Sequence, residues 1–168
     1  MDEDIIQRLY SFLALVEEST GYLSPYAPTP RDVVDDVVRL IAGLINNETR
    51  QPILYEPGCG KAHVALELSK RLGGYTVCLE IDEELAKEAH RRVLSSKEVL
   101  TEVVIGDLRY FNLRRLDLVY AYLLSYPVML LEKLLPRGSR IVSLDYLGSK
   151  KPTTIVDLGY HKLYVIEI

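Results

Sequence analysis

The stretch Ile53-Leu-Tyr-Glu-Pro-Gly-Cys-Gly-Lys61, followed by the run Tyr75-Thr-Val-Cys-Leu-Glu80, decides the fold of this chain. The first segment is an apolar run that ends in an acid and then turns on two glycines, where a helix is expected to begin. The second segment reads as a strand that ends in another acid. A strand, a glycine turn, a helix and a second strand build a nucleotide crevice, because glycines let the backbone approach a ligand and the helix start offers free N–H groups. An acid about 20 residues further on can bind ribose hydroxyls.

The residues around the glycines indicate which nucleotide fits. A dinucleotide fingerprint needs a third glycine three residues after the second, and that position is His63. A phosphate-binding P-loop is excluded because no Lys-Ser/Thr pair follows the glycines. Instead, Glu56 directly precedes Pro57 and Gly58. An acid there suits S-adenosylmethionine, because that ligand ends in an amino acid whose ammonium group needs nearby negative charge. We therefore expect Glu56 near the ammonium group and Glu80 near the ribose.

Composition indicates one soluble domain. The chain has 168 residues, of which 48% are hydrophobic and 26% charged, and this size can bury a substantial core. We expect a single domain over 1–168, with a helical cap over 1–50 and an α/β core over 51–168. No apolar run reaches the ~20 residues that span a bilayer, and the acidic start at residues 1–4 is unlike a signal peptide. These features predict a cytoplasmic protein. The lack of tryptophan and the scarcity of glutamine and asparagine are typical of a thermophile.

Charge and cysteine content exclude several classes of function. The net charge is −4 and the pI about 5.4, whereas a nucleic-acid footprint usually comes with a domain pI above about 9. The basic stretch 109–115 is then best interpreted as a solvated loop, and nucleic acid is disfavoured as a partner. Cys59 and Cys78 are predicted to be a loop filler and a small buried hydrophobe, with no disulfide. The three histidines stand apart, so no metal site is expected.

The path of the chain alternates helices with strands. A helix is expected over 3–18, an extended proline-rich segment over 22–30, and a second helix over 30–45. The predicted strands cover 52–56, 75–80, 100–105, 116–122 and 139–146, and the predicted helices between them cover 60–72, 82–95 and 126–135. The tail over 153–157 and 161–167 predicts a final antiparallel hairpin. This order resembles that of the seven-stranded, mostly parallel, Rossmann-like methyltransferase sheet.

A third acid follows the third strand. In Val103-Val-Ile-Gly-Asp-Leu108, Asp107 follows a predicted strand, as Glu56 and Glu80 do. The carboxyl ends of parallel strands meet at one edge of the sheet, where open α/β sheets bind ligands. We therefore expect the three acids to gather at one site.

Three segments carry a resemblance to a known family. Glu56-Pro-Gly-Cys-Gly60 is similar to motif I of the class I methyltransferases, with Ala62 where a third glycine is common. Together with Pro25-Tyr-Ala-Pro-Thr-Pro30 and the segment that begins Tyr122-Leu-Leu, it resembles the small archaeal protein lysine methyltransferases. These are relatives of the mitochondrial enzymes that methylate lysine in ATP synthase subunit c.

The resemblance implies a set of site residues. The proline segment of the family folds over the cofactor, which implies contacts from Tyr26, Pro28 and Thr29. The acid at the end of the third strand commonly holds the adenine amino group in these enzymes, which implies that role for Asp107. The full set of expected cofactor-binding residues is Tyr26, Pro28, Thr29, Glu56, Pro57, Gly58, Gly60, Glu80, Ile81, Asp107 and Leu108.

The acceptor is expected to be a lysine side chain of a protein. The Asp/Asn-Pro-Pro-Tyr/Phe signature of enzymes that methylate nucleobase or glutamine amino groups is absent after the fourth strand. Tyr120 and Tyr122 stand where an aromatic channel would favour the neutral amine. Leu144-Asp145-Tyr146 replaces a His-Glu/Asp-Phe segment of the family. Two alternatives stay open: a methyltransferase of the same fold that acts on RNA or a small molecule, and a cofactor-binding subunit without catalysis.

Overall fold

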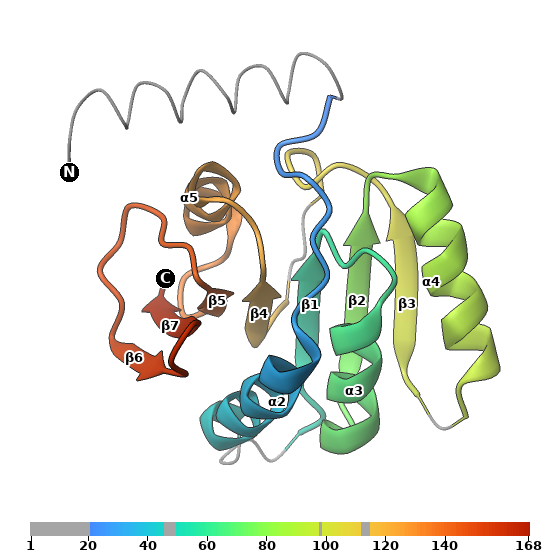
Figure 1. Ribbon diagram of the computed structural model, residues 1–168, viewed down its shortest axis with the longest axis horizontal. Helices are drawn as coiled ribbons and strands as arrows, with labels where there is room; N and C mark the ends of the chain where they lie inside the picture. The colour runs from blue at the N-terminus through green and yellow to red at the C-terminus, as the bar shows by residue number, and fades with distance from the viewer. Residues whose placement is uncertain (1–20, 46–49, 98, 112–114) are drawn as a thin grey trace.

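The computed structural model describes residues 21–45, 50–97, 99–111 and 115–168, which form a seven-stranded sheet with helices on both faces (Figure 1). The helices are α2 (Arg31–Ile45), α3 (His63–Leu72), α4 (Glu83–Ser95) and α5 (Ser125–Leu134). The strands are β1 (Ile53–Pro57), β2 (Tyr75–Glu80), β3 (Thr101–Ile105), β4 (Leu118–Ala121), β5 (Arg140–Leu144), β6 (Thr154–Asp157) and β7 (Lys162–Glu167).

The strand order is β3-β2-β1-β4-β5-β7-β6. The first five strands along the chain are parallel, and β7 runs antiparallel to both β5 and β6. This confirms the predicted sheet with its terminal hairpin. Because β1 to β5 are parallel, their carboxyl ends lie at one edge, with β1 and β4 as central neighbours. The order reverses between these two strands, which is where open α/β sheets bind ligands.

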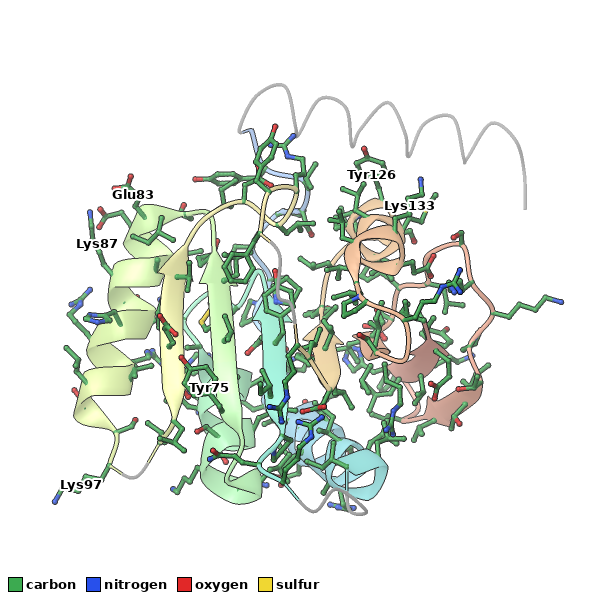
Figure 2. The ribbon with its side chains drawn as sticks, turned by 180° about the vertical axis from the view of Figure 1, so that it is seen from behind. Tyr75, Glu83, Lys87, Lys97, Tyr126 and Lys133 are labelled. Carbon is green, nitrogen blue, oxygen red and sulfur yellow. A yellow bond between two sulfur atoms is a disulfide. The ribbon has the colours of Figure 1, made fainter. Side chains whose placement is uncertain are left out.

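The two faces of the sheet carry different helices. Helices α2, α3 and α4 cover one face and α5 covers the other, as Figures 1 and 2 show from opposite sides. Leu54 packs with α2 and α3, whereas the next residue, Tyr55, packs with Val128 and Leu131 of α5. This alternation follows the period of two along a strand. It assigns Glu56, which follows Tyr55, to the same face as α3.

The cysteines contradict the sequence-based expectation. Cys59 and Cys78 form a disulfide, with Cα atoms 5.5 Å apart, so the prediction of two unpaired cysteines was wrong. The glycine turn folds back over β2, where the backbone N–H groups of Gly58 and Cys59 both donate to the carbonyl of Leu79. This return brings two cysteines that are 19 residues apart into contact.

The helix expected near the N-terminus and the expected end of β5 have different outcomes. The helix expected over 3–18 lies outside the described residues. Strand β5 ends at Leu144, two residues before the predicted end, because Asp145 has φ of 63° and leaves the extended conformation. Among the residues that the structure describes, no helix has the length and apolar character needed to cross a membrane.

Candidate functional site

A cleft opens at the carboxyl edge of the sheet. It holds about 750 Å³ of empty space, a volume that includes open solvent. Segment 22–27 forms one wall, and the ends of β2 and β3 form the floor. The lining residues are Tyr22, Leu23, Ser24, Pro25, Tyr26, Ala27, Gly58, Leu79, Glu80, Ile81, Asp82, Leu85, Gly106, Asp107, Leu108, Tyr122, Leu123 and Pro127.

The wall segment is tied to the sheet edge at several points. The Tyr22 hydroxyl donates to the Asp82 carboxylate at 3.0 Å, and the Leu124 backbone N–H donates to the Ser24 hydroxyl at 3.4 Å. Thr29 and Tyr120 share a hydrogen bond between their hydroxyls at 2.8 Å. These contacts join residues 60 to 100 positions apart in sequence, so the segment is a built part of the cleft.

The glycine turn lies under this wall. Gly58 and Gly60 have φ of 68° and 54°, which L residues rarely adopt. A Cβ at Gly58 would lie 2.8 Å from the Leu123 side chain, and a Cβ at Gly60 would overlap the Tyr26 ring. Ala62 also has a positive φ, 59°, at the start of α3, so the missing third glycine has not changed the left-handed conformation there.

Glu80 is a fixed, buried acceptor at the end of β2. Its Oε2 accepts from the Gly60 N–H at 2.7 Å, and its Oε1 accepts from the N–H groups of Ile81 and Asp82 at 2.9 and 3.0 Å. The residue is 5% exposed and lines the cleft. Each carboxylate oxygen has more than one lone-pair site, so Glu80 can hold the glycine turn and still accept from a ligand.

Glu56 is the least satisfied acid of the site. It is 6% exposed, and its Oε2 has no hydrogen-bond partner. Burial raises the pKa of Glu56 to about 8, with a backbone hydrogen bond from Ala65 opposing the shift and Glu80 adding to it. The side chain lines a smaller cavity that shares Tyr26, Gly58 and Tyr122 with the main cleft. It is a buried acid that a cation could convert to a carboxylate.

Asp107 lies at the end of β3 on the far side of the cleft. Its Oδ1 accepts from the Arg109 N–H, and its Oδ2 accepts from the Arg109 guanidinium, both at 2.8 Å. Burial would raise the pKa of Asp107, but these hydrogen bonds outweigh it and hold the pKa below its usual value. Asp107 therefore stays ionised and keeps its orientation.

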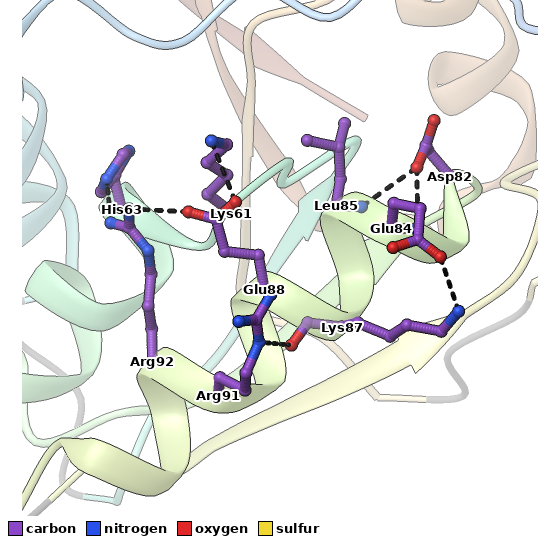
Figure 3. A network of polar contacts seen from close by, with 9 residues as sticks. All are labelled: Lys61, His63, Asp82, Glu84, Leu85, Lys87, Glu88, Arg91 and Arg92. Atoms are coloured by element: carbon purple, nitrogen blue, oxygen red, sulfur yellow. Dashed lines mark hydrogen bonds and ion pairs between the residues drawn. The ribbon is translucent and has the colours of Figure 1, made fainter.

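A polar network joins the start of α3 to the middle and last turns of α4 beside the site (Figure 3). The Lys61 ammonium pairs with Glu88 at 2.9 Å, and Glu88 also pairs with Arg92 at 3.0 Å. His63 contacts Arg92, and burial followed by the charge of Arg92 lowers the pKa of His63. The network fixes the glycine turn to the helix that follows β2.

The tyrosines of β4 and of the segment after it have different surroundings. Tyr122 lines both cavities, and its ring centroid lies 6.3 Å from that of Tyr146. Tyr120 is 1% exposed, belongs to the core beside α2 and lines neither cavity. Burial raises the pKa of Tyr120. Tyr126 lies on the outer side of α5 and is 42% exposed (Figure 2).

The structure brings most of the expected residues together. The main cleft is lined by Tyr26, Gly58, Glu80, Ile81, Asp107, Leu108 and Tyr122, and the smaller cavity adds Pro28, Thr29 and Glu56. Pro57, Gly60 and Tyr120 line neither cavity; Gly60 acts through its N–H and the space over it.

Sequence reasoning missed three polar residues that line the cleft: Tyr22, Ser24 and Asp82. Asp82 follows an expected site acid and caps α4 by accepting from the N–H groups of Glu84 and Leu85, which is a signal that could have found it. The other two depend on contacts that are distant in sequence. No cluster of metal-ligating side chains occurs among the described residues.

Comparisons with solved structures show where this fold occurs. An RNA methyltransferase from Salinibacter ruber, solved in complex with S-adenosyl-L-homocysteine, is 28% identical, with a TM-score of 0.74 over 84% of this chain and 94% of that one. TrmN from Thermus thermophilus is 18% identical, with a TM-score of 0.58 over 78% of this chain and 48% of that one.

A third structure has the same fold. It is a SAM-dependent methyltransferase from Thiobacillus denitrificans, also in complex with S-adenosyl-L-homocysteine, at 14% identity and a TM-score of 0.51 over 76% of this chain and 60% of that one. No protein-family model matches the sequence, and no curated protein matches it. These three structures are methyltransferases that are similar to this chain in fold.

Proposed function

We propose that this protein is an S-adenosylmethionine-dependent methyltransferase. The observation that carries the proposal is the unpartnered, buried Oε2 of Glu56 at the edge of the cleft. A buried polar atom without a partner is costly in a folded protein, and a ligand ammonium would satisfy it. The similarity to a Salinibacter methyltransferase with bound S-adenosyl-L-homocysteine supports the same ligand class.

The remaining groups of the cofactor also fit residues of the cleft. Glu80 offers lone pairs to ribose hydroxyls beside the glycine turn, and the positive φ of Gly58 allows the backbone to approach. Asp107, held by Arg109, offers acceptors for an adenine amino group. Leu79, Ile81 and Leu108 provide apolar surface for the base.

The chemistry asks for positioning and desolvation more than for a catalytic side chain. When bound, the cofactor supplies a methyl group on a cationic sulfur. The wall segment over 22–27 covers one side of the cleft, and Tyr122 lines both cavities. Holding two reactants in line can supply a large part of a rate enhancement.

For the acceptor we propose a lysine side chain of a protein. The aromatic rings of Tyr122 and Tyr146 and the acidic character of the chain support a basic partner. The acceptor nitrogen must be neutral when it attacks the methyl group, so its proton passes to solvent before the transfer, and burial of the amine favours that neutral form.

RNA is the second candidate for the acceptor. The observation in its favour is the likeness to the RNA methyltransferase from Salinibacter ruber, which extends over 94% of that chain. The acidic pI of about 5.4 counts against a large phosphate-contacting surface.

One experiment tests both levels of the proposal. Calorimetric titration with S-adenosyl-L-homocysteine tests the cofactor, and tritium-labelled S-adenosylmethionine incubated with cell protein and with cell RNA tests the acceptor. We expect binding and label in protein lysines. Label only in RNA would reject the lysine proposal, binding without any label would indicate a non-catalytic subunit, and no binding would reject the methyltransferase proposal.

A further inference from the structure

Strand β5 ends in a strained turn. Asp145 has φ of 63°, and the Tyr146 N–H donates to the Leu144 carbonyl at 2.8 Å across it. A hydrogen bond from residue i+2 to residue i around a positive φ is the rare, strained form of the γ-turn. The Ser143 hydroxyl donates to the Tyr146 carbonyl at 2.6 Å, so both backbone polar groups of Tyr146 are fixed.

The neighbouring strand β7 holds this turn in place. The Asp145 N–H donates to the Lys162 carbonyl at 2.8 Å, and the Lys162 N–H donates back to Asp145 Oδ1 at 3.0 Å. The His161 imidazole contacts Asp145 Oδ2 at 2.8 Å. Backbone strain of this kind costs roughly 1–3 kcal/mol and persists only where the surroundings over-determine it, most often at functional sites.

The loop that follows Tyr146 is fixed from the other side of the sheet by α5. Glu132, which is 6% exposed, accepts from the Ser149 N–H at 2.8 Å and from the Lys150 N–H at 3.1 Å. A Cβ at Gly148 would overlap the Glu132 carboxyl group. Tyr146 therefore lies between two rigid attachments.

These attachments hold the Tyr146 ring next to Tyr122, at the border of the cleft. Its ring is 6.3 Å from the ring of Tyr122, and Tyr122 lines both cavities. The two rings are inclined by 34° and not stacked. Asp145 directly precedes Tyr146 in the chain, and burial followed by the charge of Asp145 raises the pKa of Tyr122.

We propose that the Asp145 turn builds the acceptor side of the cleft, where Tyr122 and Tyr146 receive an alkylamine such as the end of a lysine side chain. Asp145 supplies negative charge beside the rings. This inference rests on the proposed function and names the residues that select its acceptor.

The chemistry of the three side chains favours an amine over a nucleobase. Aromatic faces attract alkylammonium groups, and a carboxylate adds to that attraction while it repels phosphate. The imidazole of His161, just before β7, contacts the Asp145 carboxylate through Nδ1 at 2.8 Å.

The test uses n-butylamine as the probe, with the protein saturated with S-adenosyl-L-homocysteine. Saturation-transfer NMR should detect contact with the butyl protons and give an affinity. Tyr146→Ala should weaken that affinity about fivefold, the effect expected for one cation–π contact, and Tyr146→Phe should restore it. Asp145→Asn, which tolerates the left-handed conformation, should also weaken it. Tyr160→Ala, at a fully exposed tyrosine on the β6–β7 turn, is the matched control and should have no effect.

The affinity for S-adenosyl-L-homocysteine, measured on the same samples, distinguishes a failure of the proposed methyltransferase function from a failure of the amine-binding role of Tyr146. Unchanged butylamine affinity in Tyr146→Ala, with the cofactor product bound normally, overturns the inference alone. Binding of cytidine monophosphate in place of butylamine, sensitive to Tyr146→Ala, overturns it in favour of a nucleic-acid acceptor. No binding of S-adenosyl-L-homocysteine to the parent protein removes the proposed function and with it the inference.

Discussion

Replacing Glu56 by glutamine should stabilise the ligand-free protein while it weakens cofactor binding. Glutamine keeps the shape of the side chain and an oxygen for the Ala65 N–H, but it has no charge to bury. The folded state holds the carboxyl proton up to about pH 8, whereas the unfolded state releases it near 4.5. Because the folded pKa of this acid is raised, its contribution to stability is lost as pH rises through that window.

The size of the effect follows from proton linkage. Between these two pKa values the free energy of unfolding falls by about 1.4 kcal/mol per pH unit. From pH 4.5 to pH 7 the free energy of unfolding of the parent protein falls by about 3 kcal/mol in total, and Glu56→Gln should recover that amount. At pH 4.5 the parent and the variant should be equally stable.

Urea denaturation at several pH values between 4.5 and 8 measures the difference in free energy of unfolding between the parent and Glu56→Gln. Glu83→Gln, at an exposed acid in the first turn of α4, is the matched control and should shift stability by no more than about 0.5 kcal/mol. Saturating S-adenosylmethionine should then protect the parent more than Glu56→Gln. Parallel pH profiles for the parent and the Glu56 variant would refute the assignment of a buried, ligand-free acid.

Three other perturbations test separate parts of the site. Gly60→Val should push the Tyr26 ring aside and abolish measurable S-adenosylmethionine binding in calorimetry; normal affinity in a folded variant would remove the role of the glycine turn. Backbone amides over 22–30 should exchange more slowly with solvent when S-adenosylmethionine is present, because the wall segment closes over it, and equal exchange would indicate a plain connector. If lysine is the acceptor, methyl transfer should accelerate with pH as more of an amine with a free pKa near ~10.4 becomes neutral, and a bell-shaped profile in stopped-time assays would point to a titrating base instead.

Local patterns were sufficient to predict the sheet and the acids of the site. The alternation of apolar strands with helices predicted all seven strands, and strand ends that carry an acid predicted Glu56, Glu80 and Asp107. Such patterns depend only on residues near one another in the chain. Local patterns can therefore place a side chain at the carboxyl edge of the sheet, but they do not identify the residues that it contacts.

The errors have a common physical origin in contacts between distant segments. Tyr120 is aromatic like Tyr122, but the alternation of side chains along the strand turns it toward α2. There its hydroxyl forms a hydrogen bond with the Thr29 hydroxyl. The Asp145 turn depends on hydrogen bonds from β7, 16 or 17 residues further on. The disulfide depends on how the glycine turn folds back over β2.

The disulfide between Cys59 and Cys78 means that the glycine turn can exist in an oxidised or a reduced form. Thiol–disulfide exchange needs a thiolate that can reach a sulfur, and these residues are only 6% and 0% exposed. The folded protein therefore shields both sulfur atoms from a reductant in solution, and we expect reduction to be slow until the chain opens around them. The closed loop should contribute about 3 kcal/mol to stability, which a Cys59→Ala, Cys78→Ala double variant should lose in urea. A preparation folded under reducing conditions and one folded under oxidising conditions would then be two long-lived species of one sequence, which mass spectrometry after alkylation can tell apart.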